Sequence, residues 1–374
     1  MNEEKINNST IKLRILLAPL DWGLGHATRC IPIIHTLLKH NTEVLLAANG
    51  PLKILLEKEF PKVKILDLKG YNITYARREK FFSIKLITQL PKLFSAIRKE
   101  RKWLEQIIHE EQIDAVISDN RPGLHHPSIP CVYITHQLQI QTGDQLIGRL
   151  LRKLHFTFIN KFHHCWIPDN EMGQVLAGEL SHPASYPHIP YKFLGLLSRF
   201  QKKQVSLIYD FLLLISGPEP QRSILEDKLL QAFDKSDYTF ALVRGIPSDN
   251  DTASIKTSAA RVSNHMDALD LNNLILQSNT VVARAGYSTI MDLVKLQKKA
   301  VLIATPGQTE QVYLAKYLHD KKIFASIRQE DISLSNIEKA SAQPGFSVPE
   351  YIADSHEGVV TEWLASIRQN ESVI

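Results

Sequence analysis

The sequence predicts an α/β protein made of two doubly wound, Rossmann-like domains that face a cleft. Short apolar runs alternate with amphipathic segments, and this alternation stops and then restarts near residue 209. A length of 374 residues also fits about two domains. Strands that alternate with helices need right-handed crossovers, which produce parallel sheets. A content of 44% hydrophobic and 22% charged residues is typical of a globular protein with real cores.

In the first half, short apolar runs predict buried strands and longer periodic stretches predict helices. The predicted strands are Leu13–Ala18, Glu43–Ala48, Val63–Leu68, Ala115–Ser118 and Cys131–Thr135. The predicted helices are Ala27–Lys39 and Pro51–Glu59, the latter with a proline in its first turn. The first half is therefore expected to form one parallel sheet.

The same rhythm returns in the second half. The predicted strands are Phe211–Ile215, Tyr238–Val243, Thr280–Ala283 and Ala300–Ile303, and the predicted helices are Arg222–Phe233, Asp267–Gln277, Tyr287–Leu296 and Gln308–Leu318. Residues 181–208 are rich in Pro, His and Lys and lack periodicity, which is typical of a domain boundary. We expect domains at 1–190 and 191–374, with the alternative that the last helix packs back on the first domain.

Charge and cysteine content limit the function classes. The net charge is +5, but residues 77–102 contain nine bases against two acids, so the charge is local and a general nucleic-acid binder is excluded. Three widely spaced cysteines fit a reducing compartment, and residues 1–10 lack the pattern of a signal peptide. No apolar run reaches the ~20 residues of a membrane span. We therefore expect a cytoplasmic protein.

The basic segment 77–108 is also amphipathic. Leu86, Leu90 and Phe94 belong to an apolar stripe at helical spacing, and most bases lie outside that stripe. Pro91 is expected to divide the segment into two short elements. Two interpretations remain open: the segment contacts an anionic membrane surface, or its stripe packs on the first sheet while its charges stay in solvent.

The turn after the first strand reads DWGLGHATR, residues 21–29. Its glycines, Gly23 and Gly25, permit close backbone approach, and His26 falls at the start of the next helix. A helix N-terminus disfavours imidazolium, so a neutral His26 could accept a proton, or it could simply cap the loop. A dinucleotide site is disfavoured because the third glycine is missing and no acid ends the second strand.

Two further predicted strand ends of the first domain carry titratable side chains. Asp119 follows Ala115–Ser118 and His136 follows Cys131–Thr135, so both should face the cleft. They are candidates for binding the acceptor or deprotonating it, with strand-end capping as the alternative. The string at Asp249–Asp251 resembles a metal-binding DxD motif but lies in a polar stretch that predicts a solvated loop. The pairs His125-His126 and His163-His164 lack a second ligand pair at zinc spacing.

In the second domain, residues 281–315 place two successive helix N-termini at one point. The first follows Arg284–Thr289 and the second follows Thr305–Gln311, and both are introduced by glycine and small polar residues. Amides and helix dipoles there suit a diphosphate, while carboxylate and amide side chains suit sugar hydroxyls. Plain helix capping by Ser288 and Thr289 is the alternative.

Four motifs in this order carry a family resemblance: GLGHATR, SGPEPQ (Ser216–Gln221), RAGYSTIMD (Arg284–Asp292) and TPGQTEQVYLA (Thr305–Ala315). Together they resemble the GT-B glycosyltransferases, and within these the relatives of MurG-type N-acetylglucosaminyltransferases that use a UDP-sugar. The resemblance runs from the first strand to about residue 320. It implies the GT-B architecture for the two domains and a hexosyltransferase-type enzyme.

The resemblance assigns roles by position. Asp292 falls where the family holds the donor ribose, Glu310 and Gln311 where it holds the donor sugar, and His26 where a histidine faces the reaction centre. The remaining implied donor residues are Gly25, Ser216, Gly217, His265, Gly286, Ser288 and Gln308, of which His265 begins the segment that encloses the uracil. Leu314 departs from the pattern, since MurG-type enzymes have an asparagine there. The departure puts the sugar identity in doubt.

The expected activity is transfer of a sugar from a nucleotide-diphosphate donor to an acceptor hydroxyl. The resemblance implies a UDP-sugar donor, with UDP-N-acetylglucosamine as one candidate, inversion at the anomeric carbon, and no metal or tightly bound cofactor. His26, Asp119 and His136 are the candidate catalytic residues. The acceptor is expected to be lipid-linked or a small molecule, with a peripheral position at the inner face of the membrane in the first case. A UDP-sugar 2-epimerase on the same fold and an inactive nucleotide-sugar-binding protein are the alternatives.

Overall fold

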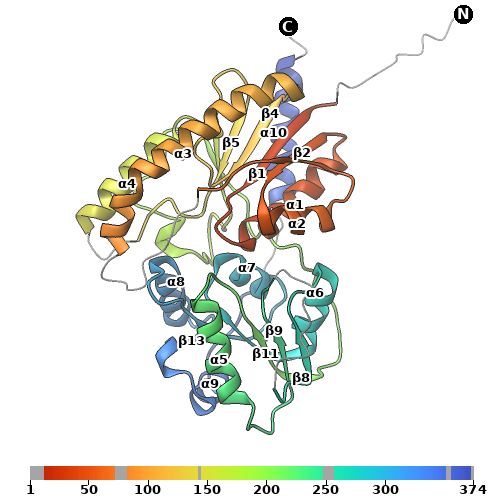
Figure 1. The fold of residues 1–374 in the computed structure, drawn as a ribbon, viewed down its shortest axis with the longest axis vertical. Helices are drawn as coiled ribbons and strands as arrows, with labels where there is room; N and C mark the ends of the chain where they lie inside the picture. Colours follow the sequence, from red (N-terminus) through yellow and green to blue (C-terminus); the bar gives the residue numbers. More distant parts are fainter. Residues whose placement is uncertain (1–11, 72–81, 142–144, 247–256, 351–354, 372–374) are drawn as a thin grey trace, which may run out of the picture.

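The computed structural model describes residues 12–71, 82–141, 145–246, 257–350 and 355–371. These residues form two domains, each built on a parallel sheet with helices packed against it, and the domains are stacked along the long axis of the molecule (Figure 1). The predicted fold class is confirmed.

The sheet of the N-terminal domain has seven strands within the described residues, in the order β3-β2-β1-β4-β5-β6-β7. Their bounds are β1 (Arg14–Pro19), β2 (Glu43–Ala48), β3 (Lys64–Asp67), β4 (Ala115–Asp119), β5 (Cys131–Ile134), β6 (His164–Ile167) and β7 (Tyr191–Phe193). Every pairing is parallel, and β1 lies between β2 and β4. The order in which strands are added to the sheet reverses between β1 and β4. A crevice is therefore expected beyond the carboxyl ends of these two strands.

Helices cover both faces of this sheet, because alternate residues of its strands point to opposite sides. Ile15 and Leu17 share a core with α1 (Leu24–Lys39) and α2 (Gly50–Glu59). Leu16 lies in a second core with residues of α3 (Phe82–Glu111) and the end of α4 (Gln145–Ile159). Two separate apolar cores thus fix the orientation of the central strand.

Two predicted boundaries are wrong. The helix α1 begins three residues before Ala27, so Gly25 and His26 belong to its first turn. The helix α3 continues through Pro91 instead of dividing there. Pro91 is exposed, and water can therefore donate a hydrogen bond to the carbonyl that the proline leaves unpaired. Residues 77–81 of the basic segment lie outside the described residues.

The C-terminal domain has a six-stranded sheet within the described residues, in the order β10-β9-β8-β11-β12-β13. Its strands are β8 (Tyr209–Leu214), β9 (Phe240–Val243), β10 (Arg261–Ser263), β11 (Ser278–Arg284), β12 (Ala300–Ile303) and β13 (Ala325–Ile327). Its helices are α5 (Gln221–Phe233), α6 (Ala268–Gln277), α7 (Tyr287–Lys295), α8 (Thr309–Asp320) and α9 (Leu334–Ala342). The order reverses between β8 and β11, which places a second crevice at their carboxyl ends.

The chain passes between the domains twice. It leaves the first sheet after β7, which pairs with β6 just beyond the boundary expected at residue 190. It returns as α10 (His356–Glu371), which lies beside the N-terminal domain (Figure 1). There Arg368 donates to the carbonyl of His40 at the end of α1, with 2.6 Å between the two atoms.

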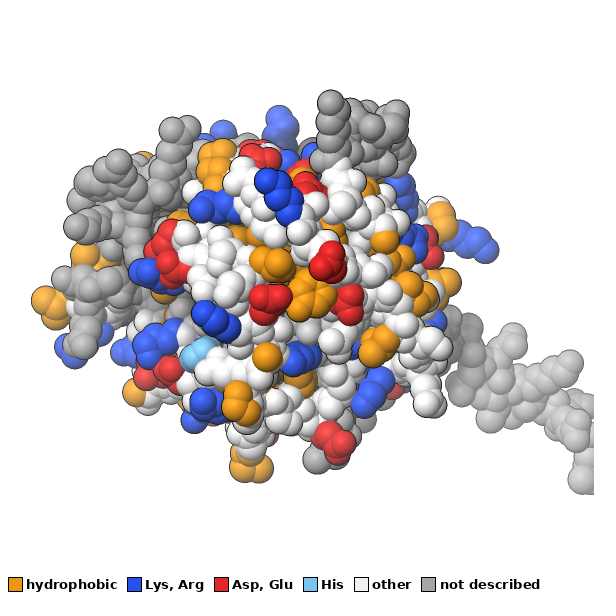
Figure 2. Space-filling view, turned by 90° about the horizontal axis from the view of Figure 1, so that it is seen from below, with side chains coloured by type: hydrophobic (Ala, Val, Ile, Leu, Met, Phe, Trp, Pro, Cys, Tyr) orange, Lys and Arg blue, Asp and Glu red, His pale blue; other side chains and the backbone are white. Residues whose placement is uncertain are grey.

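The surfaces of the two domains differ in charge. On the outer end of the C-terminal domain, basic and acidic side chains are interspersed among apolar ones (Figure 2). Single-sign charge is instead a feature of α4 in the N-terminal domain, where Arg149, Arg152 and Lys153 occur without an acid between residues 145 and 159. None of the helices among the described residues is long and apolar enough to cross a bilayer.

Candidate active site

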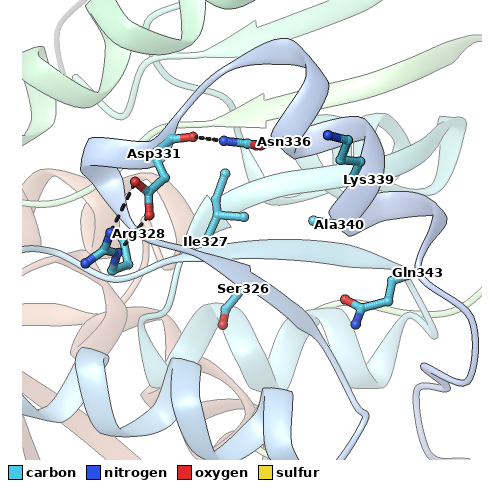
Figure 3. A pocket seen from close by; sticks show the side chains of 8 residues that line it. All are labelled: Ser326, Ile327, Arg328, Asp331, Asn336, Lys339, Ala340 and Gln343. Carbon is cyan, nitrogen blue, oxygen red and sulfur yellow. Dashed lines mark hydrogen bonds and ion pairs between the residues drawn. The ribbon is translucent and has the colours of Figure 1, made fainter.

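A surface pocket lies on the C-terminal domain between β13 and α9 (Figure 3). Arg328 and Asp331 form an ion pair on one side of it, and Lys339 and Gln343 line the other. None of the residues predicted for the site lines this pocket. The predicted residues lie instead where the two domains meet.

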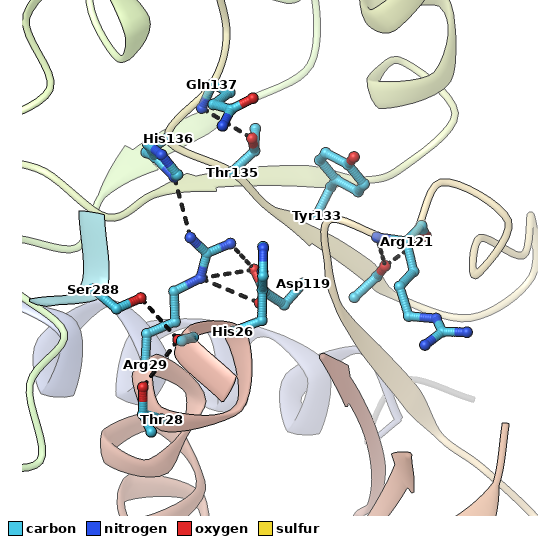
Figure 4. Close-up of polar contacts among 12 residues, drawn as sticks. His26, Thr28, Arg29, Asp119, Arg121, Tyr133, Thr135, His136, Gln137 and Ser288 are labelled. Atoms are coloured by element: carbon cyan, nitrogen blue, oxygen red, sulfur yellow. Dashed lines mark hydrogen bonds and ion pairs between the residues drawn. The ribbon is translucent and has the colours of Figure 1, made fainter. Parts of the chain in front are cut away.

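His26 and Asp119 meet at the crevice of the N-terminal sheet (Figure 4). His26 is in the first turn of α1, which follows β1, and Asp119 is the last residue of the neighbouring β4. His26 Nδ1 lies 2.8 Å from Asp119 Oδ2. Because an ionised carboxylate only accepts, Nδ1 carries the proton and Nε2 is left as the basic nitrogen.

A buried arginine completes this pair. Arg29 Nε donates to both oxygens of Asp119, at 3.1 and 3.2 Å, and Arg29 Nη2 donates to Oδ1. Burial would raise the pKa of Asp119, but the charges of Arg29 and His26 hold that pKa below its ordinary value. Asp119 is therefore an anion at neutral pH.

The environment of His26 favours its neutral form. Burial lowers the pKa of His26 below the ordinary 6.5, and the positive charge of Arg29 lowers it further, against the opposing effect of Asp119. Its side chain is 16% exposed, whereas that of Asp119 is fully buried. A neutral imidazole backed by a carboxylate and partly open to solvent can act as a general base.

His136 connects this group to the second domain. Arg29 Nη1 lies 3.1 Å from His136 Nδ1, and His136 Nε2 lies 2.8 Å from Glu310 Oε1 in the first turn of α8. An arginine can only donate, so Nδ1 accepts and Nε2–H donates to the Glu310 carboxylate. The ring also stacks on Tyr287, with 4.2 Å between centroids. Gln137 donates to the other oxygen of Glu310.

A second contact between the domains joins two helix N-termini. Ser288 Oγ, in the first turn of α7, donates to the carbonyl of Gly25 in α1 over 2.8 Å. A Cβ at Gly25 would lie 2.8 Å from that Oγ, so only glycine permits this approach. The contact places the amide ends of α1 and α7 at the same point of the interface.

The donor residues expected in the C-terminal domain lie at the carboxyl ends of its strands. Ser216 and Gly217 follow β8, and Gly217 has a φ of 108° that favours glycine. Gly286 is the N-cap of α7 and Gln308 is the N-cap of α8. His265 is half-buried in the loop after β10. These loops all lie at one edge of the parallel sheet.

Like Ser288 and Glu310, two more of the expected donor residues have partners within the protein. Gln311 Oε1 accepts from the backbone N–H of Thr305 at 2.9 Å and so fixes the loop before α8. Asp292 Oδ1 accepts from Ser198 Oγ at 2.5 Å, in the segment that links the domains. Burial raises the pKa of Asp292 to about 7, although Ser198 and Arg199 oppose the change.

Comparisons with known proteins agree with this geometry. Residues 222–344 match the model of the Glycosyltransferase family 28 C-terminal domain. The fold is similar to that of the glycosyltransferase SnogD from Streptomyces nogalater, at 12% identity over 95% of this chain and 100% of that one, with a TM-score of 0.61. MurG from Acinetobacter baumannii is similar at 13% identity over 96% and 95% of the two chains, with a TM-score of 0.51.

The chain therefore has the GT-B fold of these glycosyltransferases. A third similar structure is LpCGTa in complex with UDP, at 11% identity over 96% of this chain and 99% of that one, with a TM-score of 0.58. Comparison with curated protein sequences finds no match.

The other sequence candidates lie outside this candidate site. His163 Nδ1 accepts from the backbone N–H of Cys131 at 3.1 Å, and His125 contacts Arg101. Asp249–Asp251 lies outside the described residues. Among the residues that are described, no group of three or more His, Cys, Asp or Glu side chains could hold a metal ion.

Sequence reasoning missed Arg29, Gln137 and Tyr287 as parts of the site. One signal for Arg29 was present, because residues three apart on a helix lie on one face and Arg29 follows His26 at that spacing. The partners of Gln137 and Tyr287 come from the opposite domain or its interface. A single sequence contains no signal for such contacts.

Proposed function

We propose that this glycosyltransferase transfers a hexose from a UDP-sugar to an acceptor hydroxyl in a single inverting displacement. The observation that carries the proposal is the His26–Asp119 pair, which leaves His26 Nε2 as a proton acceptor at the interface between the domains. The UDP in the similar LpCGTa structure supports the choice of nucleotide.

In this mechanism the acceptor oxygen attacks the anomeric carbon while His26 Nε2 takes its proton. The bond between the anomeric carbon and the diphosphate oxygen breaks, and UDP leaves with the bonding electrons. Asp119 holds the ring through Nδ1 and stabilises the imidazolium that forms, as the carboxylate does in a serine-protease triad. Both ring nitrogens of His136 are already engaged, which favours His26 as the base.

The C-terminal domain supplies the donor site in this proposal. The departing diphosphate lies against the loops after β8 and β11, where the backbone N–H groups at the start of α7 stabilise its charge. Asp292 accepts from the ribose hydroxyls, exchanging its bond with Ser198 for them. Glu310 and Gln311 bind the sugar hydroxyls from the start of α8.

The decisive experiment combines a donor screen with a His26→Ala variant. Thermal shift over a panel of nucleotide sugars identifies the donor, since a ligand at 100 Kd stabilises by about 2.7 kcal/mol. Turnover of the labelled donor should then fall by a factor of about 10²–10⁴ in His26→Ala, with donor binding retained. His35→Ala, an exposed position on the same helix, is the matched control. Wild-type turnover in His26→Ala would remove His26 from the mechanism, and a free epimerised sugar nucleotide as product would reject transfer.

We further propose that the acceptor is lipid-linked and that α3 and α4 contact an anionic bilayer. The two helices pack together through Phe94 and Phe158, whose ring centroids are 5.8 Å apart. Outward from this contact, the side chains of Leu146 and Leu150 are 72% and 67% exposed. The same two helices carry exposed bases: Lys92, Arg98, Lys99 and Lys102 on α3, and Arg149 and Lys153 on α4. Exposed apolar groups among bases are typical of a surface that binds anionic lipid.

Vesicle sedimentation tests the membrane contact. Each base near an anionic leaflet contributes about 1 kcal/mol, so binding should be strong at low salt, weak at high salt and absent with neutral vesicles. Replacing Arg98, Lys99, Arg149 and Lys153 together by Glu should abolish binding to anionic vesicles. The control reverses four exposed lysines elsewhere: Lys62, Lys202, Lys203 and Lys235. If both variants bind equally, or the wild type ignores anionic vesicles, the acceptor is a soluble molecule.

A further inference from the structure

We propose that Arg29 is a positioning residue of the glycosyl-transfer reaction: its guanidinium holds Asp119 and His136 in the arrangement that the base His26 needs, and it links them to Glu310 of the donor domain. The inference rests on the proposed function, in which His26 is the base. It assigns a role to a residue that lies in the motif GLGHATR but was given no role there.

The guanidinium lies between its two partners and donates to each of them (Figure 4). Nε and Nη2 bind the carboxylate of Asp119, while Nη1 points to His136 Nδ1 at 3.1 Å. Arg29 is 2% exposed, Asp119 is fully buried and His136 is 3% exposed, so water does not compete for these bonds. The rigid planar fork of an arginine matches a carboxylate on one side and still leaves a donor for a third group.

This arrangement fixes the carboxylate that orients His26. Asp119 Oδ2 accepts from both His26 Nδ1 and Arg29 Nε, and Oδ1 accepts from Arg29 Nε and Nη2. Rotation of the carboxylate would break the bonds with Arg29 and move the acceptor away from His26. Arg29 therefore determines the direction in which the imidazole points.

The same guanidinium selects the tautomer of His136. Because Arg29 Nη1 can only donate, His136 must accept at Nδ1 and carry its proton on Nε2, where it donates to Glu310. A continuous hydrogen-bonded series thus runs from His26 through Asp119, Arg29 and His136 to Glu310. Its last member is on α8, so Arg29 connects the base to the domain that holds the donor.

Charges on three other elements also face His26. Asp119 on β4 favours the imidazolium, His136 after β5 disfavours it, and Glu310 on α8 is close enough to interact with it. Arg29 is the permanent cation in this set, and it lowers the pKa of His26. Removing that cation would leave His26 facing two carboxylates, which raises the pKa of His26 and moves the acid limb of kcat/KM to higher pH.

The test compares Arg29→Met and Arg29→Lys with Arg121→Met. Arg121 is a matched control because it is 1% exposed and its Nε donates to Glu100 Oε1 at 2.7 Å, outside the series. Three readouts are needed: kcat and KM with the identified donor and acceptor, the acid limb of kcat/KM against pH, and imidazole 15N chemical shifts of His136.

Arg29→Met should lower kcat by about 10²-fold, as expected for a misplaced catalytic group, with the donor KM little changed. Its acid limb should move to higher pH, and His136 should lose its single Nε2–H tautomer. Arg29→Lys keeps the charge without the fork, so its acid limb should stay near that of the wild type while kcat remains reduced. Arg121→Met should lose stability with no shift of the acid limb.

An Arg29→Met protein with the wild-type acid limb and tautomer would overturn the proposal. If Arg29→Met does not fold, wild-type kcat in Arg29→Lys would overturn it equally. These outcomes are separate from failure of the proposed function, which is read from His26→Ala. An inactive His26→Ala beside an unshifted Arg29→Met rejects only the role of Arg29.

Discussion

Replacing Asp119 by Asn tests the centre of the site with the smallest change of shape. In the wild type, both carboxylate oxygens accept: Oδ2 from His26 Nδ1, and both oxygens from Arg29. An amide has one oxygen and one NH₂ group, so one of the surrounding donors must face another donor. The variant keeps the volume of Asp119 and removes its charge and half of its accepting capacity.

The structure sets the expected magnitude for stability. Asp119 and Arg29 are a buried pair, and removing one charge of such a pair costs about 3–5 kcal/mol because the other stays buried and uncompensated. At about 2–4 °C per kcal/mol for a domain of this size, Tm should fall by about 6–20 °C. Arg29 keeps the pKa of Asp119 in the folded state below its ordinary value of 3.8. The ionised Asp119 therefore stabilises the fold fully above pH 3.8, and this stabilisation is lost as the pH falls through the lowered pKa. The difference in Tm between Asp119→Asn and the wild type should therefore vanish in strong acid.

Turnover should fall more than stability alone implies. An Asn presents its NH₂ to His26 in one orientation and thereby favours the wrong imidazole tautomer, a change that costs about 10⁴-fold in kcat beneath the histidine of a serine protease. The assay is release of UDP at 20 °C below the Tm of the variant, so that unfolding does not contribute. Asp114→Asn is the control, since Asp114 accepts from the backbone N–H of Arg14 near the opposite end of β4. Wild-type turnover and Tm in Asp119→Asn would refute the reasoning.

Three further predictions concern the donor site and pH. Asp292→Ala should weaken UDP binding by about 1.5–3 kcal/mol in calorimetry, the range for a hydrogen bond to a charged group, and unchanged UDP affinity in a folded variant would contradict the ribose assignment. Glu310→Ala and Gln311→Ala should weaken binding of the UDP-sugar while sparing UDP, and equal losses for both ligands would contradict that division. Burial and Arg29 lower the pKa of His26 below its ordinary value of 6.5. As the pH falls, kcat/KM should therefore decline only below pH 6.5, where protonation removes the base. A decline that begins above pH 6.5 would exclude His26 as its cause.

Sequence patterns predicted the central strands of both sheets because these are apolar on both faces, whereas β6, β7, β10 and β13 were not predicted. They also placed Asp119 and His136 at strand ends, and the structure has Asp119 as the last residue of β4 and His136 two residues after β5. The contacts of Asp119 with His26 and of His136 with Arg29 depend on the order β1-β4-β5 across the sheet. That order follows from how the helices of the crossovers pack, and the local sequence does not contain it.

Other features were outside the reach of pattern reasoning for identifiable reasons. Pro91 predicted a break, but an exposed proline in a long helix costs little more than one hydrogen bond that water replaces. Gln311 was assigned to the sugar from its position, and the structure adds a partner that the position did not predict, because its side-chain oxygen accepts from the backbone N–H of Thr305. The pairing of Glu310 with His136 joins residues of different domains, and only the docked structure reveals it.

The return of α10 to the N-terminal domain makes that domain discontinuous in sequence. Trp363 of α10 is 5% exposed and packs edge-on against Trp166 of β6, with ring centroids 5.4 Å apart. A fragment cut after β7 would therefore lack part of its own core, and the complementary fragment would carry an uncovered apolar helix. The chain connects the domains twice, after β7 and before α10. A rotation of one domain must therefore be accommodated by both connections at once. Any opening of the domains must bend both connections together, and tryptophan emission from this pair offers a probe of whether the helix stays docked on β6.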